Sequence, residues 1–581
     1  MTMKHFFGFC LGLLISLLAG GVASAQTSSG PVELANANIA DLQAAFHKGT
    51  LTAEKLLELY LARIDAYDKK GPKINSVIAL NPKALEEARA LDAERKAGKI
   101  RGPLEGIPFS LKDNINTVDV PTTGGSCLLA GSIPPADAVV VKKLRAAGAI
   151  LISKDNLSEF AAGGGSVAGA SDPAILKAGS VPQGLSSIGG QTLNPNDLEH
   201  GPAGSSSGTG AGVSAVFTQF GLGTDDRGSV RLPSSANGDV GLRPTLGLLS
   251  RRGLIPLSAS FDTSGPIARN VHDIAVVLGV LAGVDPEDEA TKRSAGRFQT
   301  DYTQFLKIGS LKGARIGVGR DFMGNDPETN RIMDEAIATM KQLGAIIVDP
   351  IRFPDYVQVI KEPLFNLIRT TEFKAEFNDY LKTLKPGYPK TLDEFSAKAN
   401  DPNSCYMTTS PEKAFSFQYT VAHALDLNDP IYQAAVKDGL GVVKLGTQGV
   451  FSRNHLDAII YPTSVREAGR IEPENIRAWQ AIAPAGEAAL RSALAQGSAQ
   501  AQTGGRGGAD SAELIATYSW SPELVVPAGM AKDGLPITVS FMGQPYSEPK
   551  ILSYGYDFEQ ATRARVLPKN TPSLPGEKIM R

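Results

Sequence analysis

Residues 202–229 read PAGSSSGTGAGVSAVFTQFGLGTDDRGS, and small residues dominate the whole stretch. Glycine is favoured where a backbone turns tightly or approaches another group closely, because it has no side chain to accommodate. One serine-rich loop surrounds Ser205, and a second loop ends at Ser229. Residues 211–220, between them, are predicted to form a helix of small residues. The stretch therefore predicts two polar loops joined by one closely packed helix.

The sequence upstream of this stretch has the pattern of an α/β protein. Residues 106–111 form a buried strand in this interpretation, and the strand ends at Lys112. Residues 137–147 are predicted to be a helix stopped by Gly148, and residues 149–153 are the next strand. A strand–helix–strand unit of this kind places its two strands in parallel. We therefore expect a central mixed, mostly parallel twisted sheet flanked by helices on both faces.

Hydrophobic periodicity predicts the remaining elements. Further helices are expected over 40–69, 84–96, 271–282 and 548–565, and further strands over 456–461, 524–526 and 537–542. Residues 295–450 are expected to form a mainly helical elaboration. Residues 480–512 are rich in Ala, Gln and Gly, which is typical of an exposed insertion. We expect a single domain over 26–581.

The N-terminus is typical of a secretory signal peptide. Lys4 and His5 precede an apolar run over 6–18, and Ala-Ser-Ala follows at 23–25. A basic start, a short apolar run and small residues at a cleavage site predict removal of residues 1–25. The alternative is an uncleaved membrane anchor, for which the run is short. We expect a periplasmic or secreted protein with no membrane association after signal cleavage.

Charge excludes some classes of partner. The 581 residues include 58 basic and 60 acidic ones, which gives a formal net charge of −2 without strong blocks of either sign. Nucleic-acid binding depends on clustered basic residues, so no nucleic acid is expected as a partner.

Cysteine usage leaves one question open. Cys10 leaves with the signal peptide, so only Cys127 and Cys405 remain. These two can pair in an oxidising compartment, but their separation in the sequence does not establish a bridge. They lack the local spacing of a metal site, and no metal is expected.

One motif points to a different class of hydrolase. Gly204–Gly208 matches the G-x-S-x-G nucleophile elbow, with Ser206 as nucleophile. An elbow needs a buried strand immediately before it, whereas residues 194–202 are polar and contain prolines. It also needs a downstream histidine, for which the candidates are His272, His423 and His455. Each of these lies in an ordinary helix or loop context, so the elbow is not favoured.

Several motifs in order resemble the amidase signature family. The lysine strand corresponds to Gly106–Asn114, the first serine motif to Gly204-Ser205-Ser206, and the second to Gly223–Ser229. Ser205 and Ser229 are 24 positions apart, as in the family. Further similar segments are residues 240–245, 253–256, 456–463 and 533–536. The resemblance covers about residues 35–565 and is weak over 295–450. Residues 189–192 are most similar to the peptide-amidase branch.

The resemblance implies a catalytic set. Ser229 would be the nucleophile that forms an acyl-enzyme, and Ser205, after a cis peptide bond, would connect it to Lys112. Lys112 would be the neutral base of this relay. A neutral lysine at pH 7 requires a pKa about 3 units below 10.4, or about 4 kcal/mol, which burial at a strand end can supply. No cofactor is implied.

The resemblance also implies an oxyanion hole. Its donors would be the backbone N–H groups of Asp226, Arg227, Gly228 and Ser229. The family usually has Gly or Asp where this chain has Arg227. A cation there would favour an anionic substrate, or would pair with Asp225 or Asp226.

The distance along the chain from the lysine to the first serine is a second departure. The 93 positions exceed the usual family spacing. The extra residues, within about 164–190, are expected to form a loop near the mouth of the site.

The expected function is hydrolysis of a small-molecule or peptide amide by an exported amidase, with a homodimer as a possible assembly. Three alternatives stay open. The same residues would also act on esters, carbamates or peptide C-terminal amides. The chain would otherwise be an amidotransferase subunit, against which export argues, or a catalytically inactive binding protein.

Overall fold

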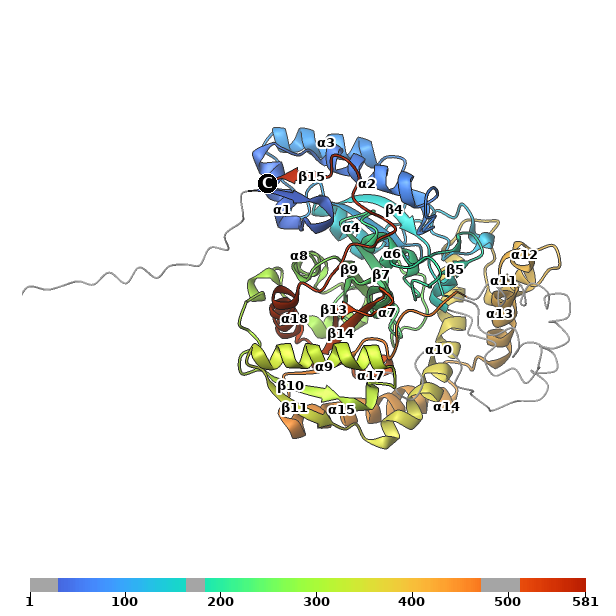
Figure 1. The fold of residues 1–581 in the computed structure, drawn as a ribbon. Helices are drawn as coiled ribbons and strands as arrows, with labels where there is room; N and C mark the ends of the chain where they lie inside the picture. The colour runs from blue at the N-terminus through green and yellow to red at the C-terminus, as the bar shows by residue number, and fades with distance from the viewer. Residues whose placement is uncertain (1–29, 163–182, 472–511) are drawn as a thin grey trace, which may run out of the picture.

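An eleven-stranded mixed sheet runs through the described part of the chain (Figure 1). The computed structural model describes residues 30–162, 183–471 and 512–581. From one edge to the other the strands are β11 (Ile346–Ile351), β10 (Arg315–Gly319), β12 (Ala458–Pro462), β14 (Pro536–Met542), β13 (Glu523–Met530), β8 (Val240–Arg243), β9 (Ser264–Ala268), β7 (Phe220–Thr224), β3 (Pro108–Lys112), β4 (Ile150–Asp155) and β2 (Val77–Leu80). The sheet brings together strands from both ends of the sequence.

The predicted mixed sheet flanked by helices is confirmed, but antiparallel pairs outnumber parallel ones. Four described pairs are parallel, namely β11–β10, β10–β12, β7–β3 and β3–β4. Six are antiparallel, from β12–β14 across to β9–β7 and at β4–β2. The connections β8–β9 and β13–β14 contain no crossover helix, so these strands return in the opposite direction.

Helices cover both faces of the sheet. Among the described residues, the α-helices outside the elaboration are α1 (Ile39–Lys48), α2 (Ala53–Tyr67), α3 (Ala84–Lys96), α4 (Val139–Ala146), α6 (Ser207–Ser214), α7 (Arg231–Asn237), α8 (Val271–Leu281), α17 (Glu513–Ser519) and α18 (Glu548–Thr562). Successive residues of a strand point to opposite faces. Accordingly Glu523 of β13 reaches Arg231 of α7, while Leu524 packs against Gly555 of α18.

The helix predicted over 211–220 is wrong in its bounds. Helix α6 begins at Ser207 and ends at Ser214, and Phe220–Thr224 is strand β7. Val216 has a φ of 60°, in the left-handed region, which a continuing helix excludes. The small residues serve close packing of helix on strand instead, because a Cβ at Gly221 would overlap the Thr209 side chain.

Residues 295–450 form mainly helices, as predicted, together with the edge strand β11 and its neighbour β10. The helices are α9 (Pro327–Gln342), α10 (Asp355–Thr383), α11 (Leu392–Ala399), α12 (Cys405–Thr409), α13 (Pro411–His423), α14 (Pro430–Ala434) and α15 (Leu440–Asn454). Helices α10 to α14 gather on one side of the molecule, at the right of Figure 1. A disulfide joins Cys127 to Cys405 of α12, with 6.4 Å between the Cα atoms, and this settles the pairing that the sequence left open.

Several predicted segments lie outside the described residues. These are the signal peptide over 1–25, most of the loop over 164–190, and the insertion over 480–512 apart from Ala512. Among the helices that the structure describes, none combines the length and the apolar character needed to cross a membrane.

Candidate active site

Three parallel strands end together at one edge of the sheet. Strands β7, β3 and β4 are neighbours and run in the same direction. Their last residues are Thr224, Lys112 and Asp155. Ligand sites of α/β sheets lie outside the carboxyl ends of the strands. The side chains discussed below gather at this edge.

Lys112 is fully buried and is surrounded by oxygen atoms. Its Nζ lies 2.7 Å from Ser205 Oγ and 2.8 Å from Thr224 Oγ1, and 3.4 Å from the Thr224 carbonyl oxygen. Asn114 Nδ2 also donates to Thr224 Oγ1, at 3.0 Å. Thr224 therefore fixes the position of the lysine at the strand end.

Ser205 begins the segment that leads into α6. The peptide bond from Gly204 to Ser205 is cis. The Ser205 side chain is fully buried, and its carbonyl oxygen accepts a hydrogen bond from Ser158 N at 3.0 Å. Ser206 N donates to the Ser229 carbonyl at 3.1 Å. The structure thus brings the backbone of Ser229 against the residue next to Ser205.

Asp225 holds the loop that carries Ser229. Its carboxylate pairs with Arg231 and Arg243, each at 3.0 Å, and accepts hydrogen bonds from Gly228 N and Val230 N at 3.0 Å. Burial alone would raise the pKa of Asp225, but the two guanidinium groups outweigh it and hold the pKa below its usual range. The loop is therefore built around a buried carboxylate that stays charged.

Known proteins are similar to this chain in both sequence and fold. The family model described as Amidase matches residues 55–552. The chain belongs to the amidase signature family. A probable amidase of Arabidopsis thaliana is 31% identical over 98% of this chain and 99% of its own length. A glutamyl-tRNA(Gln) amidotransferase chain of Thermoanaerobacter pseudethanolicus is 32% identical over 93% of this chain and 99% of its own length.

A solved peptide amidase is similar over nearly the whole fold. The structure of peptide amidase from Stenotrophomonas maltophilia has 34% identity and a TM-score of 0.76, and the match covers 92% of this chain and 99% of that chain. These similarities confirm the predicted family and its peptide-amidase-like branch. The chain is thus an amidase-family enzyme, a hydrolase of amides.

Four backbone amides, those of Asp226, Arg227, Gly228 and Ser229, were predicted to form an oxyanion hole, and the structure differs from this prediction at Gly228. Gly228 N already donates to the Asp225 carboxylate, so it is engaged within the protein. Among the described residues, the amides of Asp226 and Ser229 have no protein acceptor. Thr517 Oγ1 donates to the Asp226 carbonyl at 2.8 Å and holds that peptide. The Asp226 and Ser229 amides can therefore donate to a substrate oxygen.

The sequence left two possibilities for Arg227, an anionic substrate or a pair with Asp225 or Asp226. In the described part of the chain its ion pairs are with Glu362 and Glu513 instead. Its guanidinium binds both oxygens of Glu362 on α10, at 2.8 and 2.5 Å, and lies 3.6 Å from Glu513. Burial and the neighbouring Asp262 carboxyl raise the pKa of Asp226 well above its usual range. The charge of Arg227 is thus compensated by the helical elaboration of the amidase.

Sequence reasoning missed the residues that support the site from a distance. Ser158 contacts Ser205, Glu362 pairs with Arg227, and Thr517 holds Asp226. A signal existed for Ser158, because it follows the predicted strand next to the lysine strand. No local sequence pattern indicated Glu362 or Thr517, which lie on helices far from Ser205 and Ser229 in the sequence.

Proposed function

We propose that the protein is an exported serine amidase that hydrolyses a carboxylic amide through an acyl-enzyme on Ser229. The observation that carries this proposal is the 2.7 Å contact between Lys112 Nζ and Ser205 Oγ, both fully buried. A buried lysine beside a serine hydroxyl is suited to accept its proton, because burial disfavours the charged ammonium.

Acylation would proceed by two proton transfers. Ser229 Oγ attacks the amide carbon as its proton passes to Ser205 Oγ, and the Ser205 proton passes to Lys112 Nζ. The carbonyl oxygen becomes an anion, which the amides of Asp226 and Ser229 stabilise. The C–N bond then breaks, and the proton of Lys112 returns through Ser205 to the leaving amine.

Deacylation would reverse these roles with water. A water molecule attacks the acyl carbon, gives its proton to the relay, and the acid leaves as Ser229 regains its own proton. The reaction consumes one water and yields one acid and one amine or ammonia. Every proton has a donor and an acceptor among the three side chains, so the scheme requires no cofactor.

Similarity to the peptide amidase supports peptide C-terminal amides as the first substrates to test. Esters and carbamates suit the same acyl chemistry. Similarity to the amidotransferase chain favours a second function, release of ammonia for a partner enzyme. The disulfide supports export, because such bonds persist in oxidising compartments, whereas the amidotransferase function belongs to cytoplasmic tRNA charging.

The test is release of ammonia or amine from aliphatic, aryl and C-terminal peptide amides. We expect turnover by the parent, none by Ser229→Ala, and a loss of at least about 10²-fold for Lys112→Ala. Turnover that survives Ser229→Ala would reject the nucleophile. Absence of turnover on every amide, with hydrolysis of an ester or carbamate, would reassign the substrate. Absence of any hydrolysis would favour a binding role.

Export has its own test. Cell fractionation with antibody detection should find a form shortened by the 25 N-terminal residues outside the cytoplasm. A full-length cytoplasmic protein would refute export and favour the amidotransferase alternative.

A further inference from the structure

Residues 156–158, which follow β4, contact the backbone around Ser205. Ser158 N donates to the Ser205 carbonyl at 3.0 Å, and the Asn156 carbonyl accepts from Gly208 N at 2.8 Å. Ser158 Oγ accepts from Gly184 N at 3.0 Å. Residues 156–158 therefore contact both Ser205 and the first turn of α6, and their position sets that of the relay serine.

The next residues are held in an unfavourable backbone conformation. Phe160, Ala161 and Ala162 have φ values of 49°, 55° and 68°, in the left-handed region. Such residues persist only where their surroundings enforce the conformation. Phe160 is enclosed by rings of the helical elaboration, with centroid distances of 5.0 Å to Phe377 and 5.5 Å to Phe395. The elaboration thus enforces the conformation next to Ser158.

Glu159 connects this segment to α12. Its side chain is buried, and Oε2 accepts from Ser187 N at 2.7 Å. Oε1 accepts from the hydroxyl of Tyr406, which is fully buried and also contacts Ser126 Oγ at 2.6 Å. Tyr406 thus reaches Glu159 over 247 positions of sequence.

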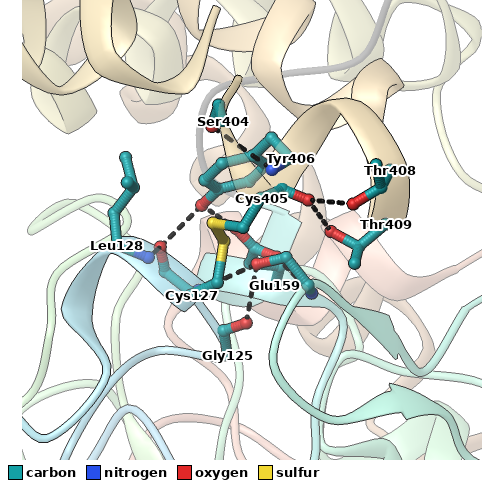
Figure 2. The surroundings of a disulfide bond; sticks show 11 residues. Gly125, Cys127, Leu128, Glu159, Ser404, Cys405, Tyr406, Thr408 and Thr409 are labelled. Carbon is teal, nitrogen blue, oxygen red and sulfur yellow. Dashed lines mark hydrogen bonds between the residues drawn. A yellow bond between two sulfur atoms is a disulfide. The ribbon is translucent and has the colours of Figure 1, made fainter. Parts of the chain in front are cut away.

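The disulfide joins the two residues adjacent to this hydrogen-bonded group. Cys405 precedes Tyr406, and Cys127 follows Ser126. Cys127 N also donates to Ser187 Oγ at 2.9 Å. Figure 2 shows the Tyr406 ring beside the disulfide and above Glu159. The covalent bond therefore keeps the tyrosine hydroxyl within reach of the carboxylate.

We propose that Tyr406 and Glu159, clamped by the Cys127–Cys405 disulfide, are positioning residues that hold Ser205 against Lys112 during acylation. This inference rests on the proposed function, because it assigns a role in the Ser229 relay. The path runs from the disulfide through Tyr406 to Glu159, along the backbone to Ser158, and by one hydrogen bond to Ser205. Loss of the tyrosine hydroxyl releases the segment and misaligns the relay.

The matched control is a second tyrosine–glutamate pair of the elaboration. Tyr432 donates to Glu372 Oε1 at 2.7 Å, and both groups are buried. Within the described parts of the chain, the hydrogen bonds of this pair do not reach residues 156–159. Tyr432→Phe therefore removes the same kind of bond without touching the proposed path.

The experiment measures the rate at which Ser229 reacts with a fluorophosphonate probe, followed by intact mass. It is run on the parent, Tyr406→Phe, Glu159→Gln, Glu159→Ala and Tyr432→Phe, with melting temperatures for each. We expect the labelling rate to fall about tenfold to a hundredfold in Tyr406→Phe and Glu159→Ala, since a displacement of about 1 Å can cost that much. Glu159→Gln, which keeps one acceptor oxygen, should restore part of the rate.

Tyr432→Phe should label within about twofold of the parent at a similar melting temperature. For a turned-over amide, kcat should fall in Tyr406→Phe with KM unchanged. The inference is overturned if Tyr406→Phe labels like the parent, or if Tyr432→Phe slows labelling equally, which would indicate general loosening of the elaboration. A parent that is not labelled at Ser229 overturns the proposed function itself.

Reduction of the disulfide tests the clamp separately. Parent protein treated with reductant, and the Cys127→Ser, Cys405→Ser double variant, should label several-fold more slowly than the oxidised parent. Reductant should leave the double variant unchanged. Equal labelling of oxidised and reduced parent would remove the disulfide from the proposal.

Discussion

Replacing Asp225 by Asn should destabilise the protein far more than the small chemical change implies. The carboxylate lies between Arg231 and Arg243 at 3.0 Å from each, and all three groups are buried. Removing one partner of a buried ion pair costs about 3–5 kcal/mol, because an uncompensated buried charge remains. Most domains have a free energy of unfolding of about 5–15 kcal/mol, so the loss takes a large share of it.

Asp226→Asn is the matched control, since the pKa of this next carboxyl along the loop is shifted in the opposite direction. Burial and the Asp262 carboxyl raise the pKa of Asp226, which favours its neutral form, and the amide of Asn resembles that form. We expect a stability within about 1 kcal/mol of the parent near pH 5, as for ordinary substitutions without a lost partner. Two adjacent residues of one type thus give opposite predictions.

The pH dependence of stability distinguishes the effect of Asp225→Asn from that of Asp226→Asn. The stabilisation from Asp225 is full above the unfolded pKa of about 3.9 and is lost as pH falls through its lowered folded pKa. The advantage of the parent over Asp225→Asn should therefore shrink as pH falls below about 4. Because the raised pKa of Asp226 favours its protonated form in the native state, the parent loses stability as pH rises above about 4. The stability of Asp226→Asn relative to the parent should therefore increase with pH.

The assay is urea unfolding followed by tryptophan fluorescence between pH 3 and pH 8. Equal midpoints for the parent and Asp225→Asn at pH 7 would refute the reasoning about the buried cluster. A difference in stability between parent and variant that did not depend on pH for either residue would refute the directions of the two pKa shifts.

Two further substitutions test how the site is supported. Thr224→Val removes the oxygen 2.8 Å from Lys112 Nζ and leaves the side chain about the same size. We expect kcat/KM, measured from progress curves, to fall about tenfold or more. An unchanged kcat/KM would show that Lys112 needs no contact besides the one to Ser205. Gly208→Ala places a Cβ 2.6 and 2.7 Å from the backbone N and O of Asn156, and should cost about 1–3 kcal/mol in thermal unfolding. Gly449→Ala, on α15 with open space around it, should be neutral or stabilising by up to about 1 kcal/mol, and a similar loss at both glycines would contradict the packing argument.

The candidate catalytic residues were predictable because each lies in a short local pattern. Lys112 ends a strand of apolar residues, and Ser205 and Ser229 lie in glycine-rich loops at a fixed spacing. The βαβ unit also predicted the parallel pair β3–β4 correctly. These features depend on residues close together in the sequence, where periodicity and turn chemistry act.

Features that depend on distant residues were not predictable. The bond from Tyr406 to Glu159 spans 247 positions, and that from Arg227 to Glu362 spans 135. The hydrophobic periodicity of residues 295–450 predicts helices, but it does not predict which residues those helices contact. The error over 211–220 has a different cause, since small residues suit a helix and a closely packed strand equally, and the left-handed Val216 decides between them.

The disulfide closes the segment from Cys127 to Cys405 into a covalent ring. Ser205 and Ser229 lie inside the closed segment between Cys127 and Cys405, whereas Lys112 lies outside it. A protease that cuts once within the ring produces two fragments that stay joined, and a gel without reductant shows a single species of full mass. A single cut within the ring therefore leaves Ser205 and Ser229 covalently joined to the part of the chain that carries Lys112.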